Sequence, residues 1–114
     1  MTPPRRPAPL KRGDIWLAAL APTLGSEIQQ TRPCVVVSPP EMNAHLRTVI
    51  VAPMTTGSRP APFRIAIVFQ RKGGLILLDQ LRTLDRQRLV KRLGAAKPAT
   101  LAALLAQLQA MFAE

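Results

Sequence analysis

The apolar residues of this chain fall into short runs that proline or glycine interrupts, and this pattern restricts the fold most strongly. Three valines at 35–37 are followed by two prolines, and the run over 47–52 ends at Pro53. Runs of β-branched residues that end in this way are typical of strands. Residues 63–69 alternate between apolar and other side chains, as in a half-buried strand. Further strands are predicted over 14–20, over 75–78 and around 89–90, with a hairpin turn over 71–74 and a helical turn over 41–46.

The end of the chain follows a different period. From Pro98, which suits the first position of a helix, apolar residues recur every three or four positions. The other side of this predicted helix is mostly Ala and Gln, so the helix must cover a sheet or a partner. Five or six short strands and one terminal helix predict a mainly β (α+β) fold, a small barrel or sandwich.

The length of 114 residues fits one domain. The first residues contain four prolines and no apolar period, which is typical of a disordered arm. We therefore expect a basic, proline-rich arm over 1–11 and a single folded domain over 12–114.

The charge is strongly positive. Sixteen Lys and Arg stand against six Asp and Glu, for a net charge of +10. Twelve of the sixteen are Arg, and residues 64–97 hold nine cations against two Asp. Because the planar guanidinium pairs with phosphate through two hydrogen bonds, this bias favours contact with nucleic acid. A coding bias that enriches Arg, Ala and Pro together is the alternative explanation.

The sequence lacks the residues that several kinds of site require. One cysteine, Cys34, and one histidine, His45, cannot supply a zinc cluster, and Gly73-Gly74 lacks the remainder of a phosphate-binding loop. We expect Cys34 to be a buried strand thiol, His45 to lie at the surface and Trp16 to belong to the core. The apolar run over 15–21 is too short for a membrane span, so we expect a cytoplasmic protein that does not enter the membrane.

Two polar segments remain as candidates for a site, residues 21–31 and 54–60. If the strands over 33–38 and 47–53 pair antiparallel, Arg32 and Thr55 emerge at the same edge of the sheet. A guanidinium and a hydroxyl placed together can bind a phosphate and stabilise charge that develops on it.

A collinear set of motifs resembles the MazF/PemK family of type II toxins over residues 12–113. The set comprises KRGDIWL at 11–17, PTLGSE at 22–27, TRP at 31–33, VVVSP at 35–39, MN at 42–43, VAPMTT at 51–56 and LDQLRT at 78–83.

This resemblance implies a small SH3-like β-barrel with a C-terminal helix that forms a homodimer. It also implies a sequence-specific endoribonuclease that cleaves single-stranded RNA to 2′,3′-cyclic phosphate and 5′-OH ends, without metal or cofactor. A cognate acidic antitoxin neutralises it. The catalytic pair of the family falls on Arg32 and Thr55, and the resemblance assigns supporting or RNA-binding positions to Ser26, Glu27, Gln30, Thr56, Asp79 and Gln80.

The sequence departs from the family at two places. Ala19 and Ala21 stand where many relatives have acidic residues, and Ser26 and Leu77 stand where some PemK-like members have a histidine and an arginine. The general base remains open between Glu27 and Asp79. Two alternatives also remain open: a CcdB-like barrel toxin that acts on a protein such as DNA gyrase, and a barrel that binds RNA without cleaving it.

Overall fold

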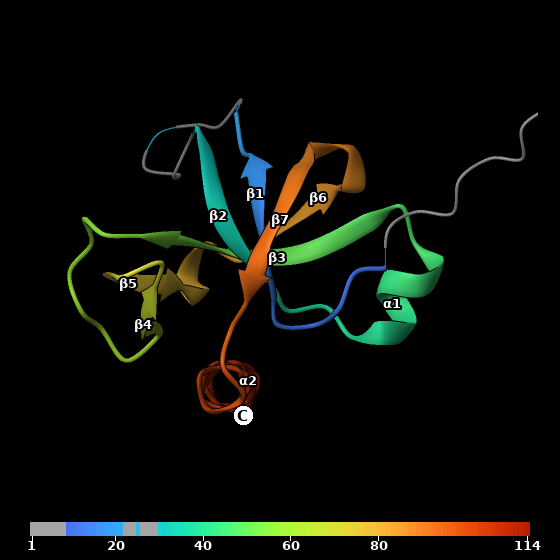
Figure 1. Cartoon of the computed structure of the whole chain (residues 1–114). Coiled ribbons are helices and arrows are strands. Elements are labelled where there is room, and N and C mark those ends of the chain that lie inside the picture. Colours follow the sequence, from blue (N-terminus) through green and yellow to red (C-terminus); the bar gives the residue numbers. More distant parts are fainter. Residues whose placement is uncertain (1–8, 22–24, 26–29) are drawn as a thin grey trace, which may run out of the picture.

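The computed structural model describes residues 9–21, 25 and 30–114, and in these ranges the chain is mainly β (Figure 1). The strands are β1 (Asp14–Ala19), β2 (Thr31–Val36), β3 (Thr48–Thr55), β4 (Arg64–Phe69), β5 (Lys72–Leu77), β6 (Arg82–Asp85) and β7 (Leu89–Ala95). The helices are α1 (Pro40–His45), α2 (Pro98–Phe112) and the single 3-10 turns η1 (Leu78–Gln80) and η2 (Arg86–Arg88). The prediction of a mainly β fold with a C-terminal helix is confirmed.

The strands form one curled antiparallel sheet in the order β4-β5-β3-β2-β1-β7, with β6 also paired to β3. Strand β3 is the centre of this arrangement. Its first half pairs with β6, with Val49 opposite Leu84, and its last residues pair with β5, with Met54 opposite Ile76. Because β3 changes partner along its length, the sheet bends into a half-barrel rather than staying flat (Figure 1).

Alternate residues of the central strands enter two separate hydrophobic clusters, as the period of a strand requires. Val35 packs with Ile15, Ile76 and the helix residue Leu104 on one side of the sheet. Its neighbour Cys34 packs with other strand residues on the other side. The second cluster also contains Leu10, which is 8% exposed, so the folded part of the chain includes a residue of the predicted arm. Residues 1–8 of that arm lie outside the described residues.

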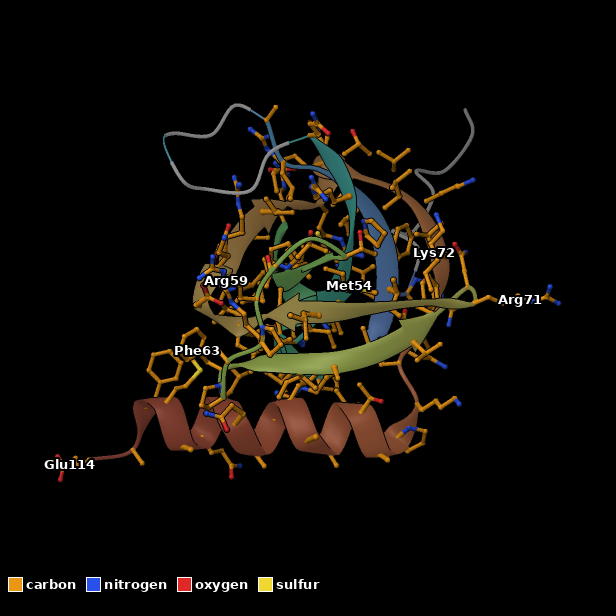
Figure 2. The ribbon with its side chains drawn as sticks, turned by 90° about the vertical axis from the view of Figure 1, so that its left-hand side faces the viewer. Met54, Arg59, Phe63, Arg71, Lys72 and Glu114 are labelled. Carbon is orange, nitrogen blue, oxygen red and sulfur yellow. The ribbon has the colours of Figure 1, made fainter. Side chains whose placement is uncertain are left out.

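Helix α2 covers the first cluster and lies against β4, as Figure 2 shows. Leu104 is fully buried, and Leu101, Leu105 and Leu108 are partly buried against the same cluster. Burial of a leucine side chain contributes roughly 1.5–3 kcal/mol, so this face is sufficient to hold the helix on the sheet. The predicted helix is confirmed.

The predicted turn over 71–74 is wrong, because the two residues between β4 and β5 are Gln70 and Arg71. Their φ angles are 51° and 66°, as a two-residue hairpin turn with two left-handed residues requires. Gly74 lies inside β5, where a Cβ atom would stand 2.8 Å from the carbonyl oxygen of Thr55. Gly74 therefore permits the close approach of two strands, and neither glycine belongs to the turn.

Strand β6 was not predicted, because its four residues have little apolar character of their own. It is a strand because Leu84 and its neighbours pair with the first half of β3. Trp16 is half-buried against the second cluster, and Cys34 is fully buried, whereas His45 is exposed. None of the helices in the described part of the chain is long and apolar enough to cross a membrane.

Candidate active site

The antiparallel pairing that the sequence suggested for β2 and β3 is confirmed. Cys34 lies opposite Pro53, and Val35 lies opposite Ala52. This pairing ends at Cys34 and Pro53, two residues from Arg32 and Thr55. Arg32 lies opposite Ala18 of β1, and Thr55 lies opposite Leu75 of β5. Both residues therefore owe their position to backbone pairing, which is less easily displaced than a surface loop.

Arg32 and Thr55 line one cavity of about 230 Å³, which we call the Arg32–Thr55 cavity. The ends of β2 and β3 form one wall, and the β4–β5 hairpin forms the other. The lining residues are Arg32, Pro33, Met54, Thr55, Thr56, Ile67, Phe69, Gln70, Lys72, Gly73 and Gly74. Its floor is apolar, and its charged groups are the two cations Arg32 and Lys72. This composition suits a ligand that carries negative charge.

The hydroxyl of Thr55 is fixed in place by the backbone that follows it. Its Oγ1 accepts a hydrogen bond of 3.2 Å from the backbone N–H of Gly57. Since an accepted bond uses only a lone pair of the oxygen, the Thr55 O–H can still donate to a second group. The arrangement presents a donor to the cavity from the last residue of β3.

Arg32 is half-buried in β2, with Pro33 directly after it. The buried thiol of Cys34 donates to the Arg32 carbonyl oxygen at 3.6 Å. Burial raises the pKa of Cys34 to about 12, although the charges of Arg82 and Arg32 act in the opposite direction. The thiol is therefore protonated at neutral pH, and Cys34 is unsuited to nucleophilic chemistry.

Asp79 and Gln80, two of the predicted supporting residues, do not line the Arg32–Thr55 cavity. They belong to η1, beyond the end of β5 that is distant from the hairpin turn. Both carboxylate oxygens of Asp79 accept hydrogen bonds from Arg64, at 3.2 and 3.1 Å. The hydrogen bond with Asp79 raises the pKa of Arg64. Arg64 also donates to the carbonyl oxygen of Arg59, so Asp79 helps to hold the segment that follows Thr55.

The other supporting residues are divided. Thr56 is exposed and lines the cavity beside Thr55. Gln30 is exposed, has a φ of 74° and accepts a hydrogen bond of 3.1 Å from the N–H of Leu20 through its carbonyl oxygen. It closes the base of the segment over 21–31 and is not a lining residue of the cavity. Ser26 and Glu27 lie outside the described residues.

Two arginines hold the end of β1 beside the same segment. Arg82 donates to the carbonyl oxygen of Leu20 at 3.2 Å, and Arg88 donates to those of Ala19 and Ala21. Buried or half-buried carbonyl groups that lack a strand partner need such donors. These guanidinium groups thus fix the end of β1, where Ala19 lies opposite Thr31, the residue before Arg32.

The hairpin wall of the cavity was missed by the sequence analysis. Phe69, Gln70, Lys72, Gly73 and Gly74 reach the cavity because β5 pairs with the end of β3, where Thr55 lies opposite Leu75. The available signal was the pair of glycines, which had been assigned to the turn. Within the described ranges, no three His, Cys, Asp or Glu side chains gather where they could hold a metal ion.

Known proteins resemble this chain in sequence and in fold. Residues 11–112 match the family described as "PemK-like, MazF-like toxin of type II toxin-antitoxin system". Endoribonuclease PemK of Escherichia coli is 41% identical over 86 residues, which are 71% of this chain and 65% of that protein, less than two thirds of its length. Endoribonuclease MazF of Staphylococcus epidermidis is 38% identical over 90 residues, 74% of this chain and 75% of that protein.

Solved structures show the same fold. MazF from Deinococcus radiodurans has a TM-score of 0.81 at 25% identity, covering 92% of this chain and 97% of that one. A MazE-MazF structure from the same organism has a TM-score of 0.76 at 25% identity, covering 92% and 96%. The family match spans nearly all of the folded part, including the strands that carry Arg32 and Thr55. The chain therefore belongs to the family of PemK-like and MazF-like toxins of type II toxin–antitoxin systems.

Proposed function

We propose that this chain is the toxin of a type II toxin–antitoxin system and that it cleaves single-stranded RNA, mRNA included, at specific sequences without a metal ion. The observation that carries the proposal is the meeting of Arg32 and Thr55 in one cavity, on paired strands. Family membership and the relatives named endoribonuclease support it. They favour it over a CcdB-like toxin directed at a protein and over a barrel that only binds RNA.

The reaction uses the substrate's own nucleophile. The 2′-OH attacks the adjacent phosphorus, the bond to the 5′ oxygen of the next nucleotide breaks, and the products carry a 2′,3′-cyclic phosphate and a 5′-OH. Negative charge builds on the equatorial oxygens of the five-coordinate phosphorus. Arg32 supplies a fixed positive charge with paired donors for these oxygens, and Thr55 supplies a further hydrogen bond.

The proton of the 2′-OH passes to a base, and the 5′ oxygen receives a proton as it leaves. A guanidinium is a poor base, because arginine keeps its proton in proteins. The acidic candidates are Glu27 and Asp79. Asp79 is bound by Arg64 and is not among the lining residues, so it is less suited to the role. The acidic limb of the pH–rate profile distinguishes them, because only replacement of the true base by its amide removes that limb.

The positive charge of the cavity also accounts for inhibition by an antitoxin. The family description places these toxins in toxin–antitoxin systems, and a MazE-MazF structure is among the similar ones. An acidic antitoxin segment and RNA would compete for a surface whose cations include Arg32 and Lys72. We further propose that the toxin is a homodimer and that it acts in the cytoplasm, where mRNA is present.

The test is incubation of the purified protein with long single-stranded RNAs in EDTA, followed by mapping of both new ends. Cleavage at a short recurrent sequence, with 2′,3′-cyclic phosphate and 5′-OH ends, is the expected result. RNAs that together contain all short sequence motifs and stay intact would reject the ribonuclease. RNA that is bound but never cut would favour the binding barrel.

A further inference from the structure

A second cavity lies along the β4–β5 hairpin and has no part in the reaction described above. Its volume is about 460 Å³, within the range of small-molecule sites. One wall is the hairpin, and the other is the end of β7, the connection at Ala96 and Lys97, and Thr100 in the first turn of α2. We call it the Lys97 cavity. Five residues line both this cavity and the Arg32–Thr55 cavity, which makes the two cavities neighbours across the hairpin: Ile67, Phe69, Gln70, Gly73 and Gly74.

Gly73 stands at the junction and is not explained by the fold. It lies inside β5, where glycine weakens a strand, and its φ is not in the left-handed region. A Cβ atom added there would meet nothing within 4 Å, whereas one added at Gly74 would strike the Thr55 carbonyl. Packing and backbone conformation therefore require Gly74 but not Gly73. Because Gly73 has no side chain, open space remains between the two cavities. Glycine is often found in a strand where a ligand passes close to the backbone.

The hairpin turn is also unusual. Its two central positions have positive φ, and Asn-Gly is the pair that such a turn favours. Here the residues are Gln70 and Arg71, whose side chains make this conformation less favourable. Gln70 lines both cavities, and Arg71 is exposed at the tip of the hairpin, where Figure 2 shows it extending away from the molecule. Long polar side chains thus occupy a conformationally unfavourable turn beside the place where the two cavities meet.

The chemistry of the Lys97 cavity suits one nucleotide of a nucleic acid strand. Lys97 is the charged residue of its lining, and Gln70 and Thr100 add hydrogen-bonding groups. Phe69 supplies an aromatic surface, and its ring is held beside Gly94 of β7. A cation for phosphate combined with an aromatic or apolar surface for a base is the usual composition of single-strand sites. In the part of the chain that the structure describes, no acidic residue lines either cavity.

We propose that the Lys97 cavity is a second nucleotide subsite, in which the RNA strand leaving the Arg32–Thr55 cavity passes over Gly73. Lys97 binds a phosphate there, and Gln70 and Thr100 contact the adjacent nucleotide. The proposal rests on the proposed ribonuclease function. The subsite adds a specific claim to that function: the protein contacts RNA beyond the cleaved bond, on the opposite side of the hairpin.

The first experiment combines protein variants with shortened substrates. The cleavage site is mapped on a long RNA, and two oligonucleotides are made that end directly beside the cleaved dinucleotide, one on its 5′ side and one on its 3′ side. Lys97→Gln is expected to raise KM for the uncut long oligonucleotide roughly fivefold, the loss of one charge-assisted contact. One of the two shortened RNAs lacks the nucleotide that the Lys97 cavity binds. On that RNA the ratio of the KM of Lys97→Gln to the wild-type KM is expected to fall to about one.

The matched control is Lys91→Gln, which removes the same charge from β7 outside both cavities. Its effect on KM should be the same for long and shortened RNA. The salt dependence gives a second readout, because the slope of log KM against log salt should decrease by about 0.7 when one phosphate contact is lost from Lys97.

A second variant blocks the passage without removing a charge. Gly73→Val places a β-branched side chain in open space within a strand, so Tm should stay equal or rise, while KM for the long RNA increases. Affinity for an all-deoxy oligonucleotide, which lacks the nucleophilic 2′-OH, makes the comparison independent of cleavage. Weaker binding of the long oligonucleotide by both Lys97→Gln and Gly73→Val is expected there too.

Equal KM ratios on all three RNAs, with unchanged affinity for the deoxy oligonucleotide, would overturn the subsite. So would a loss of inhibition by the antitoxin with KM unchanged, because the cavity would then be a protein-binding site. A wild-type protein that cuts no RNA would reject the ribonuclease. The subsite would still be supported if Lys97→Gln and Gly73→Val, but not Lys91→Gln, then weakened binding of the long single-stranded RNA.

Discussion

The β4–β5 hairpin and the segment over 82–92 are both rich in cations, but they use them differently. In the segment over 82–92, four arginines hold other parts of the fold: Arg82, Arg86 and Arg88 donate to backbone carbonyl oxygens, and Arg92 pairs with the buried Asp14 at 3.2 Å. At the hairpin, Arg71 and Lys72 are exposed, and Lys72 lines the Arg32–Thr55 cavity.

The difference shows why the net charge of a segment does not locate a binding site. The excess of cations over 64–97 was interpreted as a surface for RNA. In the structure much of it is arginine bound to carbonyls or to a carboxylate, while the cations that line the cavities are few: Arg32, Lys72 and Lys97. Substitutions in the two groups should therefore have separable effects on activity and on stability.

Apart from Arg32, the largest separation between activity and stability is expected at Thr55, which lines the same cavity. Thr55→Val keeps the β-branched shape that suits the end of β3 but removes the hydroxyl, so kcat should fall about 100-fold with little change in Tm. Single-turnover cleavage of a mapped RNA measures the effect. Thr55→Ser, which restores an O–H donor, should recover much of the rate. Full activity of the valine variant would remove Thr55 from the chemistry.

A substitution among the arginines over 82–92 should have the opposite effect: it should lower stability. Arg82→Met keeps much of the side chain volume but leaves the carbonyl oxygen of Leu20 without its donor, at a cost of about 1–2 kcal/mol. Thermal unfolding should show a Tm lower by about 4–8 °C for each kcal/mol. Arg71→Met, at the exposed tip, is the control and should leave Tm unchanged. Equal Tm values for both variants would contradict the structural role of Arg82.

Cys34, on which the charges of both Arg82 and Arg32 act, gives a prediction for pH. Its pKa is raised from 9.0 to about 12 in the folded chain, so the unfolded chain loses this proton first as the pH rises. The contribution of the protonated Cys34 thiol to the free energy of unfolding is complete below pH 9. It decreases by about 1.4 kcal/mol per pH unit between 9 and 12. Urea unfolding across this range should show a steeper loss for the wild type than for Cys34→Ala. Parallel curves would mean that Cys34 titrates alike in both states.

The smallest effect is expected at the pair of Arg64 and Asp79, which lies near the surface. Asp79→Asn should lower Tm only slightly, and the difference should decrease in high salt, because exposed ion pairs contribute little and are screened. If Asp79 is not the base, the variant also keeps the acidic limb of the wild-type pH–rate profile. Loss of that limb would assign the base to Asp79.

The sequence predicted those features that depend on local pattern. The alternation over 63–69 and the leucines of α2 are each properties of a single segment, and both were confirmed. The strand end predicted at Pro53 was wrong, because β3 continues through Pro53, which lies opposite Cys34, to Thr55. The antiparallel pairing of β2 with β3 also followed from the sequence, because a short connection between two strands favours an antiparallel pair.

Features that depend on contacts between distant segments were missed. Gly73 and Gly74 look like turn residues until the approach of β5 to Thr55 is known, and Arg82–Asp85 forms a strand only against β3. The hairpin wall of the Arg32–Thr55 cavity is a consequence of the same pairing. Likewise, no local pattern distinguishes the arginines that bind carbonyl oxygens from the cations that line the cavities.

One measurement tests the central claim, that the fixed charge in the Arg32–Thr55 cavity performs the chemistry while the arginines over 82–92 hold the fold. It is the paired determination of kcat/KM and Tm for Arg32→Gln and Arg88→Gln, which remove the same charge. We expect Arg32→Gln to lose at least about 1000-fold in kcat/KM with Tm retained, and Arg88→Gln to lose Tm with most activity retained below its transition. An active Arg32→Gln variant, or an inactive Arg88→Gln variant with unchanged Tm, would contradict the claim.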